Sequence, residues 1–513
     1  MPATPPSPAA ATTPPWRSPL FWLLAWALAS TASRVLLSQA LMWDQAEQTV
    51  WSQQLAWGYG PQPPLYTWLQ WAVNGVLGPT VLSLALVKKT LMVLTFVFMF
   101  IAARQLMPAP AAWLAALGMW WLPGMGWQAL RDLTHTVLLT CLVAATWWLL
   151  LRQLRRPSPG GFAALGLALG LGVLSKYSYV LFAGAALAAA LSLPQPRRAL
   201  LSRGWWLAPL IAALLVAPHA LWVLQHWQEA SSSTLAKLRP AYEATGWRGM
   251  LAGLGDLLTM LGLAALPWAL MAWWAFGRRA WRTPAPSADT TPPWAVPLLL
   301  RYLGLIVCGL LAMVVLGNVS NFDGRWIHPL VCMAPMAAFA WRPGLGDQPR
   351  GRRRYLGAVL GMALLLWLGG AADPLIDARR GRADRFNWPV VRMAERLRAA
   401  GYDGRSPIIA SHHIIAGVLR TRFPLAPVTV CDADLPQAVG CVRQAVRAAE
   451  ARGQGWLMVA ADDAAPNGWW LAGTPASGAL PCLQTWALPY RRARADTPPL
   501  RLDLMLHTAP IYK

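Results

Sequence analysis

Charged residues are scarce in this sequence. Lys, Arg, Asp and Glu make up 13% of its 513 residues, whereas an ordinary soluble domain has about 25%. Only 21 residues are acidic against 44 basic ones, and six cysteines are too few for a disulfide scaffold. Hydrophobic residues make up 56% and come in long blocks, which excludes a mainly soluble or disordered chain. The surplus Arg residues are dispersed between these blocks, which argues against nucleic-acid binding.

Eleven apolar blocks are long enough, or nearly long enough, to cross a bilayer as helices. The sequence therefore predicts a mostly α, polytopic membrane protein of about 11 transmembrane helices, several of them short. The blocks are Ser18–Leu41, Thr80–Ala103, Pro110–Pro123, Leu133–Leu151, Gly161–Ser175, Ser178–Leu193, Trp205–Leu224, Met250–Phe276, Trp294–Leu316, Ile327–Trp341 and Tyr355–Ala372.

Charge alternates between successive loops. The loops on one side contain sixteen Arg residues against two acidic ones, Asp289 and Asp347. Positively charged loops stay in the cytoplasm, so we expect segment 1–17 inside and loop 42–79 outside a bacterial inner membrane. The first block is interpreted as a retained span and not as a removed signal peptide. Residues 18–372 form the membrane domain, and residues 373–513 form a soluble, extracytoplasmic domain.

The C-terminal segment alternates short apolar runs with helix-like stretches. The runs Pro407–Ala410, Val428–Val430 and Trp456–Ala460 are separated by turn residues and by a predicted helix over Ala438–Ala451. This pattern is typical of a small α/β domain. An oxidising exterior permits a Cys431–Cys441 bridge, although a third cysteine, Cys482, leaves other states open. His412 and His413 are interpreted as ordinary residues of this domain, because neither acidic residues nor metal-ligand spacing accompany them.

The first outer loop contains Asp44 and Glu47 but no Lys or Arg. Two interpretations fit Asp44. An acidic group at the end of a span is often simply solvated. Arg34 lies within the outer part of the preceding span, however, and ionisable groups at membrane depth usually mark a functional cavity.

Several motifs in the membrane part resemble the GT-C class of membrane glycosyltransferases. The chain is most similar to the bacterial protein-O-mannosyltransferase-like family, which includes the aminoarabinose transferase that acts on lipid A. The matching motifs are Asp44-x-x-Glu47, Gly58-Tyr59-x-x-x-Pro63-Pro64-Leu65, Gly172-Val-Leu-Ser-Lys176-Tyr177, Pro218-His219-Ala-Leu-Trp222 followed by His226, and Arg325-Trp-Ile-His-Pro329.

The resemblance implies transfer of a sugar from a polyprenyl-phosphate donor to an acceptor hydroxyl outside the membrane. It also implies that an acidic residue of the first outer loop, here Asp44, acts as base. A placed carboxylate can accept the proton of an attacking hydroxyl, and one direct displacement inverts the anomeric centre. The departing phosphate needs fixed cations, and the candidates are Lys88, Lys89, Arg131, Lys176 and Arg325. Further site candidates are Glu47, Arg34, Tyr59, Gln62, Tyr177 and His226.

Each of these cations also has an ordinary interpretation. Lys88 and Lys89 lie about two turns inside the second span, where long side chains snorkel to the interface. Lys176 occupies a short hairpin, and phosphate contact is favoured there over snorkelling. Arg325 follows Asp323 by two residues and is placed to pair with it.

Asp132 is the second candidate for a catalytic carboxylate. It stands at the outer mouth of the fourth span, three residues before His135. The alternative is an N-cap, because Asp before a helix start satisfies free backbone N–H groups. His135 is expected to be packed and not to bind a ligand.

The chain departs from the family pattern where relatives place a metal. Relatives commonly have an acidic or His residue just before the Pro-Pro pair, and here that position is Gln62. His226 matches the second half of that site, but Gln is a poor zinc ligand. We therefore expect no tightly bound metal and no cofactor.

Two other function classes compete with a transferase. A lipid transporter or flippase would be expected to show inverted repeats or paired broken helices near the midplane, and the sequence shows neither. A noncatalytic scaffold leaves the clustered outer Asp, Lys and Arg residues unexplained. The sequence does not identify the sugar, the acceptor or the length of the polyprenol.

Overall fold

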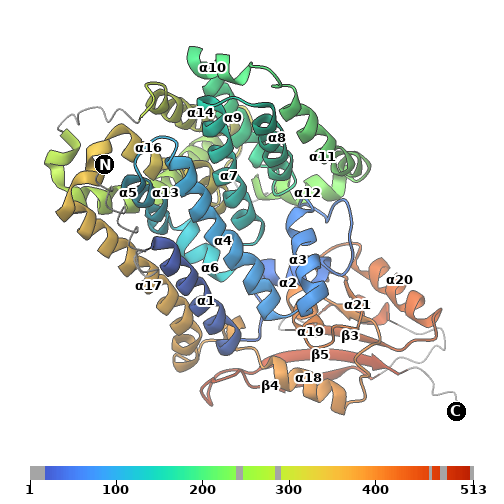
Figure 1. The fold of residues 1–513 in the computed structure, drawn as a ribbon. Helices are drawn as coiled ribbons and strands as arrows, with labels where there is room; N and C mark the ends of the chain where they lie inside the picture. The colour runs from blue at the N-terminus through green and yellow to red at the C-terminus, as the bar shows by residue number, and fades with distance from the viewer. Residues whose placement is uncertain (1–17, 239–245, 283–290, 462–464, 474–481, 509–513) are drawn as a thin grey trace, which may run out of the picture.

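The structure is a computed structural model and describes residues 18–238, 246–282, 291–461, 465–473 and 482–508. The predicted cytoplasmic segment 1–17 lies outside these ranges. Seven helices of the described residues are long and apolar enough to cross a membrane (Figure 1). They are α1 (Pro19–Leu37), α4 (Val81–Ala103), α7 (His135–Arg155), α11 (Leu207–Gln225), α13 (Gly246–Arg282), α14 (Ala295–Val315) and α17 (Pro349–Arg379).

The remaining predicted spans form shorter or broken helices. Helix α9 (Tyr179–Leu191) and α10 (Pro194–Leu200) pass the same test only as a pair, which is bent by 114°. The shorter helices of the membrane part are α5 (Ala109–Leu117), η2 (Gly118–Trp121), η3 (Gly124–Gln128), α6 (Ala129–Arg131), α8 (Pro159–Val173), α12 (Trp227–Leu238), α15 (Gly324–Val331), α16 (Ala334–Trp341) and η4 (Pro343–Asp347). The described residues thus contain seven or eight such spans, and the count of eleven stays a prediction.

Two short helices of the predicted outer loop lie between α1 and α4. They are α2 (Trp43–Trp51) and α3 (Leu65–Leu77), joined by a turn through Tyr59 and Gln62. Asp44 is the second residue of α2, so the loop presents its acidic group at a helix start.

Residues 408–507 contain a five-stranded sheet of order β2-β1-β3-β5-β4. Its first three strands are parallel, and β5 runs antiparallel to both β3 and β4. The three apolar runs expected as strands form β1, β2 and β3, and Cys431 and Cys441 are joined in a disulfide. The elements are η5 (Arg385–Asn387), α18 (Val390–Ala399), β1 (Ile408–Ala410), α19 (His413–Arg420), β2 (Val428–Val430), α20 (Ala438–Glu450), β3 (Trp456–Ala461), α21 (Asn467–Leu471), β4 (Gln484–Leu488) and β5 (Leu500–His507).

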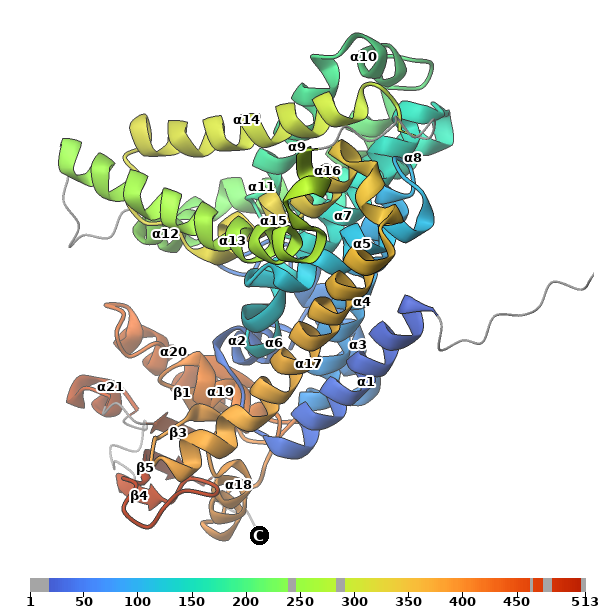
Figure 2. The ribbon, with the colours of Figure 1, turned by 90° about the vertical axis from the view of Figure 1, so that its left-hand side faces the viewer.

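Alternating residues of the sheet pack into two hydrophobic cores. Leu457 and Val459 of β3 face α18 and α19, while Trp456 and Met458 face α20 and α21. The first of these cores also contains Ala46 of α2. Figure 2 shows the sheet and its helices at one end of the helical bundle, with α19 beside α2. The C-terminal segment therefore shares a core with the loop that carries Asp44.

Candidate active site

Asp44 and Asp132 are held together by reciprocal contacts at two helix starts. The backbone N–H of Asp44 donates to the Asp132 carboxylate at 2.9 Å. The Asp44 carboxylate accepts from the backbone N–H and the hydroxyl of Thr134, at 3.1 and 3.3 Å. The first N–H groups of a helix have no partner within the helix. Each carboxylate therefore satisfies a donor near the start of the other segment's helix.

The interpretation of Asp132 as the N-cap of α7 is wrong. That helix begins at His135, and its N-cap residue is Thr134. Asp132 instead accepts from the start of α2, while Asp44 binds the start of α7. Burial raises the pKa of the Asp132 carboxyl to about 6, and the Asp44 carboxylate adds to the rise. The two carboxyl groups thus lie close enough for their charges to interact at a partly buried site.

A chain of polar contacts connects α2 to α7 and α3. Gln48 lies one turn after Asp44, and its amide nitrogen is 2.9 Å from Nε2 of His135. The amide oxygen of Gln48 accepts from the Thr67 hydroxyl at 2.9 Å. His135 is buried, as expected for a packed residue. Lys176 donates to the hydroxyl of Thr136, the next residue of α7, at 2.8 Å, so Lys176 lies on this side of the carboxylate pair.

A cavity lined by four cations lies near the pair, since Lys88 in its lining interacts with the charge of Asp132. Its volume is about 70 Å³, and it opens between α1, α4 and α17. Arg34, Lys88, Lys89 and Arg131 line it together with Gln45 of α2. The structure thus brings together four of the predicted site residues, which lie far apart in the sequence.

Lys88 and Lys89 are both buried within the protein. Lys88 donates to the Leu130 carbonyl at 3.3 Å and lies close enough to Asp132 to interact with its charge. The Lys89 ammonium lies 4.7 Å from the ring centroid of Trp26. The snorkelling interpretation is therefore wrong for both residues, because each points into the cation-lined cavity.

Arg34 connects the cavity to α2. Its guanidinium donates to the carbonyls of Ser38 and Ala40, at 2.7 and 2.5 Å, and to the side chain of Gln45 at 3.0 Å. These contacts hold the connection between α1 and α2 against the cavity, which Ser38 and Gln45 also line.

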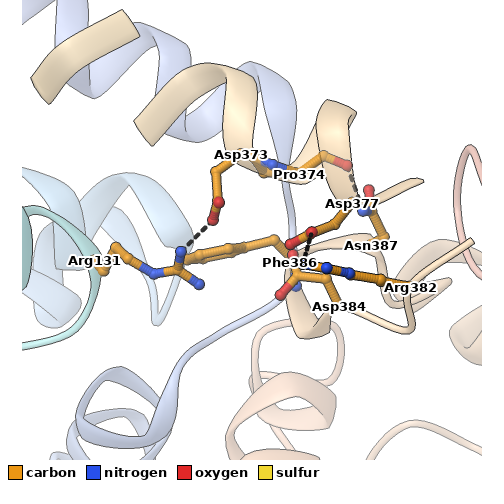
Figure 3. A network of polar contacts seen from close by, with 8 residues as sticks. All are labelled: Arg131, Asp373, Pro374, Asp377, Arg382, Asp384, Phe386 and Asn387. Carbon is orange, nitrogen blue, oxygen red and sulfur yellow. Dashed lines mark hydrogen bonds and ion pairs between the residues drawn. The ribbon is translucent and has the colours of Figure 1, made fainter. Parts of the chain in front are cut away.

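Arg131 forms an ion pair with Asp373, near the end of α17 (Figure 3). Its guanidinium also lies 5.5 Å from the ring centroid of Phe386, and Arg34 lies 5.0 Å from the same ring. The Phe386 carbonyl accepts from Ser38 at 2.6 Å. One aromatic residue of the C-terminal segment therefore closes the cavity between two arginines.

The turn that carries Phe386 is held by its own polar contacts. Asn387 donates to the Pro374 carbonyl at 2.6 Å, and Asp384 accepts from the Phe386 N–H at 3.2 Å (Figure 3). Burial raises the pKa of the Asp384 carboxyl, and Arg131 opposes this shift. Arg382 lies 3.8 Å from Asp377 in the same turn.

Two other candidates have structural partners. Arg325 pairs with Asp323 at 2.6 Å, and the Asp323 carboxylate also accepts from the Arg325 N–H at the start of α15. Arg325 still lies near enough to Asp132 to interact with its charge. Glu47 is half-buried on α2, one turn after Asp44.

The aromatic candidates stabilise the loop and the neighbouring helices. The Tyr59 hydroxyl donates to the Gln54 carbonyl at 2.7 Å and accepts from the Ala56 N–H, while Gln62 pairs with Tyr59 through the backbone. The Tyr177 hydroxyl is 3.3 Å from Nε2 of His219. Burial raises the pKa of the Tyr177 hydroxyl to about 12. His226 is exposed at the end of α11 and stacks on Trp222.

Metal binding stays untested. Within the described ranges, no three His, Cys, Asp or Glu side chains form a group suited to a metal ion. Gln62 and His226 occupy the two positions where relatives place a metal. Gln62 pairs with Tyr59 through the backbone, and Nδ1 of His226 is 2.9 Å from the Trp222 carbonyl.

Sequence reasoning missed the contributions of the C-terminal segment. Phe386 and Asp373 lie more than 240 residues from Arg131, so no local pattern indicates their contact. His413 was expected to be an ordinary residue, yet its ring lies 5.8 Å from Trp43 and 6.0 Å from Trp51 of α2. Gln48 follows Asp44 by four residues, a spacing that places both on one side of α2, whereas no such spacing indicated that Gln45 lines the cavity.

Comparisons with known proteins show the family of the chain. Residues 61–222 match the family model described as dolichyl-phosphate-mannose-protein mannosyltransferase. The chain is 32% identical over 484 residues to the lipopolysaccharide core galacturonosyltransferase RgtA of Rhizobium johnstonii, covering 91% of this chain and 93% of the relative. The chain belongs to the GT-C family of membrane glycosyltransferases. This glycosyltransferase is also 29% identical to RgtB of the same organism, over 80% of this chain and 82% of the relative.

A solved structure shares the fold of this glycosyltransferase. It is that of ArnT from Cupriavidus metallidurans bound to undecaprenyl phosphate, with a TM-score of 0.60, 15% identity, and coverage of 98% of this chain and 99% of the other. The enzyme is thus a multi-pass membrane protein with a GT-C fold.

Proposed function

We propose that this enzyme transfers galacturonic acid from a polyprenyl-phosphate donor to a hydroxyl of the lipopolysaccharide core, at the outer face of the bacterial inner membrane. The observation that carries the proposal is the position of Asp44 at the start of α2. Its neighbour Gln45 lines the cation-lined cavity, and its own carboxylate accepts from Thr134, the residue before His135. The sugar and the acceptor are those named for RgtA, the relative that is 32% identical over most of its length.

The donor is supported by two adjoining cavities. An apolar groove of about 480 Å³ runs along α1 and α17 and is lined by residues such as Leu23 and Leu360. Trp367 lines both this groove and the cation-lined cavity, and Trp26 of the groove covers Lys89. A polyprenyl phosphate is a long apolar chain with one anionic end. The groove suits the chain, and the cavity suits the phosphate.

The chemical step is a single displacement. The acceptor oxygen forms a bond to the anomeric carbon while the bond from that carbon to the phosphate oxygen breaks. Asp44 accepts the proton of the acceptor hydroxyl, and the polyprenyl phosphate departs with the bonding electrons. Lys88, Lys89 and Arg34 stabilise the charge that develops on the leaving phosphate. The product therefore has the inverted anomeric configuration.

Asp132 is proposed to act through Asp44. Its carboxylate holds the backbone N–H of Asp44 and so fixes the start of α2. Because the two carboxyl groups are close enough for their charges to interact, Asp132 also contributes negative charge that favours protonation of Asp44 during transfer. Lys176 and Arg325 are proposed to contact the sugar or the phosphate from the side opposite Lys88.

The substitution Asp44→Asn tests the proposed base. An Asn oxygen still accepts from Thr134, so the fold is retained while the base is lost. We expect the rate of transfer, measured with purified protein, lipid-linked sugar and rough lipopolysaccharide, to fall by about 100-fold or more. The matched control is Asp434→Asn, an exposed carboxylate of the C-terminal segment. A normal rate in Asp44→Asn would rule out Asp44 as the base, and NMR of the product gives the anomeric configuration.

A further inference from the structure

A second polar cavity lies between the end of α1 and the C-terminal segment. Its volume is about 670 Å³. We call it the arginine cleft, because four guanidinium groups line it, those of Arg392, Arg422, Arg491 and Arg492. Glu395 is the single carboxylate in its lining. The cleft therefore has a higher share of charged residues than the chain as a whole, in which 13% of the residues are charged.

The four arginines have few partners of opposite charge. Arg491 and Arg492 both donate to the Leu37 carbonyl at 3.2 Å, and Arg422 donates to the side chain of Gln39 at 3.1 Å. Among the residues that the structure describes, none of the four forms an ion pair. Each guanidinium has five N–H donors, so most donors of the cleft are available to an anion.

The backbone also indicates a specialised site. Arg492 has a φ of 64°, a left-handed conformation that is uncommon outside glycine. Residues held in such conformations cluster at ligand-binding sites. Burial lowers the pKa of Arg422, and the positive charge of the nearby Arg398 lowers it further. An anion in the cleft would relieve the mutual repulsion of these groups.

The cleft lies where the lipid-facing surface ends. Leu36, on its rim, is 73% exposed at the end of the apolar helix α1. Leu375 and Ile376, near the end of α17, are exposed as well. Leu36 of α1 and Arg392 of α18 both line the cleft, so α1 ends beside α18. A headgroup in the cleft therefore remains attached to acyl chains in the membrane.

The arginine cleft and the cation-lined cavity are neighbours. Arg34, Leu37 and Ser38 line the cation-lined cavity, whereas Leu36 and Gln39 line the arginine cleft. The two sites thus adjoin along one short segment, residues 34–39. A glycolipid anchored in the cleft would have its sugars within reach of Asp44.

We propose that the arginine cleft binds an anionic group, phosphate or carboxylate, of the acceptor glycolipid and so selects an acidic acceptor. This inference rests on the proposed function, because it assumes a lipid-anchored acceptor. Guanidinium groups bind both phosphate and carboxylate through paired hydrogen bonds, so the cleft accepts either group. Trp388 and Tyr490 in its lining add aromatic surface.

Binding is measured first, without turnover. The Asp44→Asn protein, in phosphatidylcholine nanodiscs, is titrated with rough lipopolysaccharide. We expect Arg392→Gln combined with Arg492→Gln to weaken binding about tenfold or more, since hydrogen bonds to charged groups are strong. The control, Arg443→Gln with Arg447→Gln, removes the same charge from the exposed side of α20 and leaves binding unchanged. Arg392→Lys with Arg492→Lys is expected to retain part of the affinity, because Lys keeps the charge but not the paired geometry.

Kinetics separate this inference from the proposed function. In the active enzyme, the Gln pair raises the KM for lipopolysaccharide about tenfold while kcat and the KM for the lipid donor stay unchanged. Unchanged binding and unchanged acceptor KM would overturn the inference. Equal competition by phosphatidylglycerol at the same mole fraction, or by inorganic phosphate at the same concentration, would also overturn it, because the cleft would then bind any anion. Full activity of Asp44→Asn would contradict the proposed base but leave these binding results standing.

Discussion

Gly417 of α19 lies directly against Ala46 of α2. A Cβ atom at residue 417 would stand 2.6 Å from the Cα and 2.7 Å from the carbonyl oxygen of Ala46. These are backbone atoms, so they cannot rotate away. Since Ala46 follows Asp44 by two residues, the C-terminal segment sets the position of the proposed base.

The substitution Gly417→Ala should therefore reduce transfer without contacting substrate. The added methyl group forces α2 and α19 apart, and overpacking of this kind costs about 1–3 kcal/mol. We expect kcat to fall about tenfold, because a shift of about 1 Å in a catalytic group costs up to 100-fold. The control is Gly440→Ala, since a Cβ at that position of α20 meets no atom within 4 Å. If both variants kept the wild-type kcat, the segment would not position Asp44.

The substitution Asp132→Asn should stabilise the enzyme in a manner that depends on pH. Burial and the adjacent Asp44 raise the pKa of Asp132 from 3.8 to about 6 in the folded state. Folded protein thus binds this proton more tightly than unfolded protein, and stability falls as pH rises from about 4 to about 6. Asn carries no charge, and its oxygen still accepts from Asp44. At pH 8 we expect the free energy of unfolding of Asp132→Asn to exceed that of the wild type by on the order of 1–3 kcal/mol. The variant should therefore have a higher thermal midpoint.

The stability gained by Asp132→Asn should shrink below pH 6 and vanish near pH 4, because Asp132 of the wild type is then protonated and also uncharged. Melting curves of both proteins in one detergent across this range provide the measurement. A stability difference that does not change with pH would contradict the assignment of the raised pKa to Asp132.

Removal of the Lys88 ammonium should impair use of the lipid donor. Lys88 is buried in the cation-lined cavity and near Asp132. Lys88→Met is expected to lower kcat/KM for the lipid-linked sugar about 100-fold, a typical loss for one charge-stabilising group. Lys88→Arg should retain more activity because it keeps the charge. Donor titrations at saturating acceptor test this, and an unchanged kcat/KM in Lys88→Met would remove Lys88 from the donor site.

The sequence predicted the local features of this enzyme better than its long-range contacts. The lengths of the apolar blocks located α1, α4 and α7, and short apolar runs located β1, β2 and β3 but not β4 or β5. The position of Asp44 after the first span made it the leading candidate for the site. Contacts such as Arg131 with Asp373 depend on how distant segments pack, and no spacing rule indicates them. The N-cap alternative for Asp132 is wrong because helix α7 begins at His135, two residues later than the hydrophobic block suggests.

The ion pair between Arg131 and Asp373 should couple the segment before α7 to the end of α17. Both side chains are about three-quarters buried, with exposures of 26% and 24%. We expect Arg131→Gln and Asp373→Asn each to lower thermal stability, and the double variant to lose little more than the worse single variant. The coupling energy should lie between about 0.5 and 3 kcal/mol. The exposed pair Arg494–Asp496, with exposures of 60% and 69%, is the control cycle and should couple by at most about 1 kcal/mol. Equal coupling in the two cycles would mean that the buried pair does not tie the segments together.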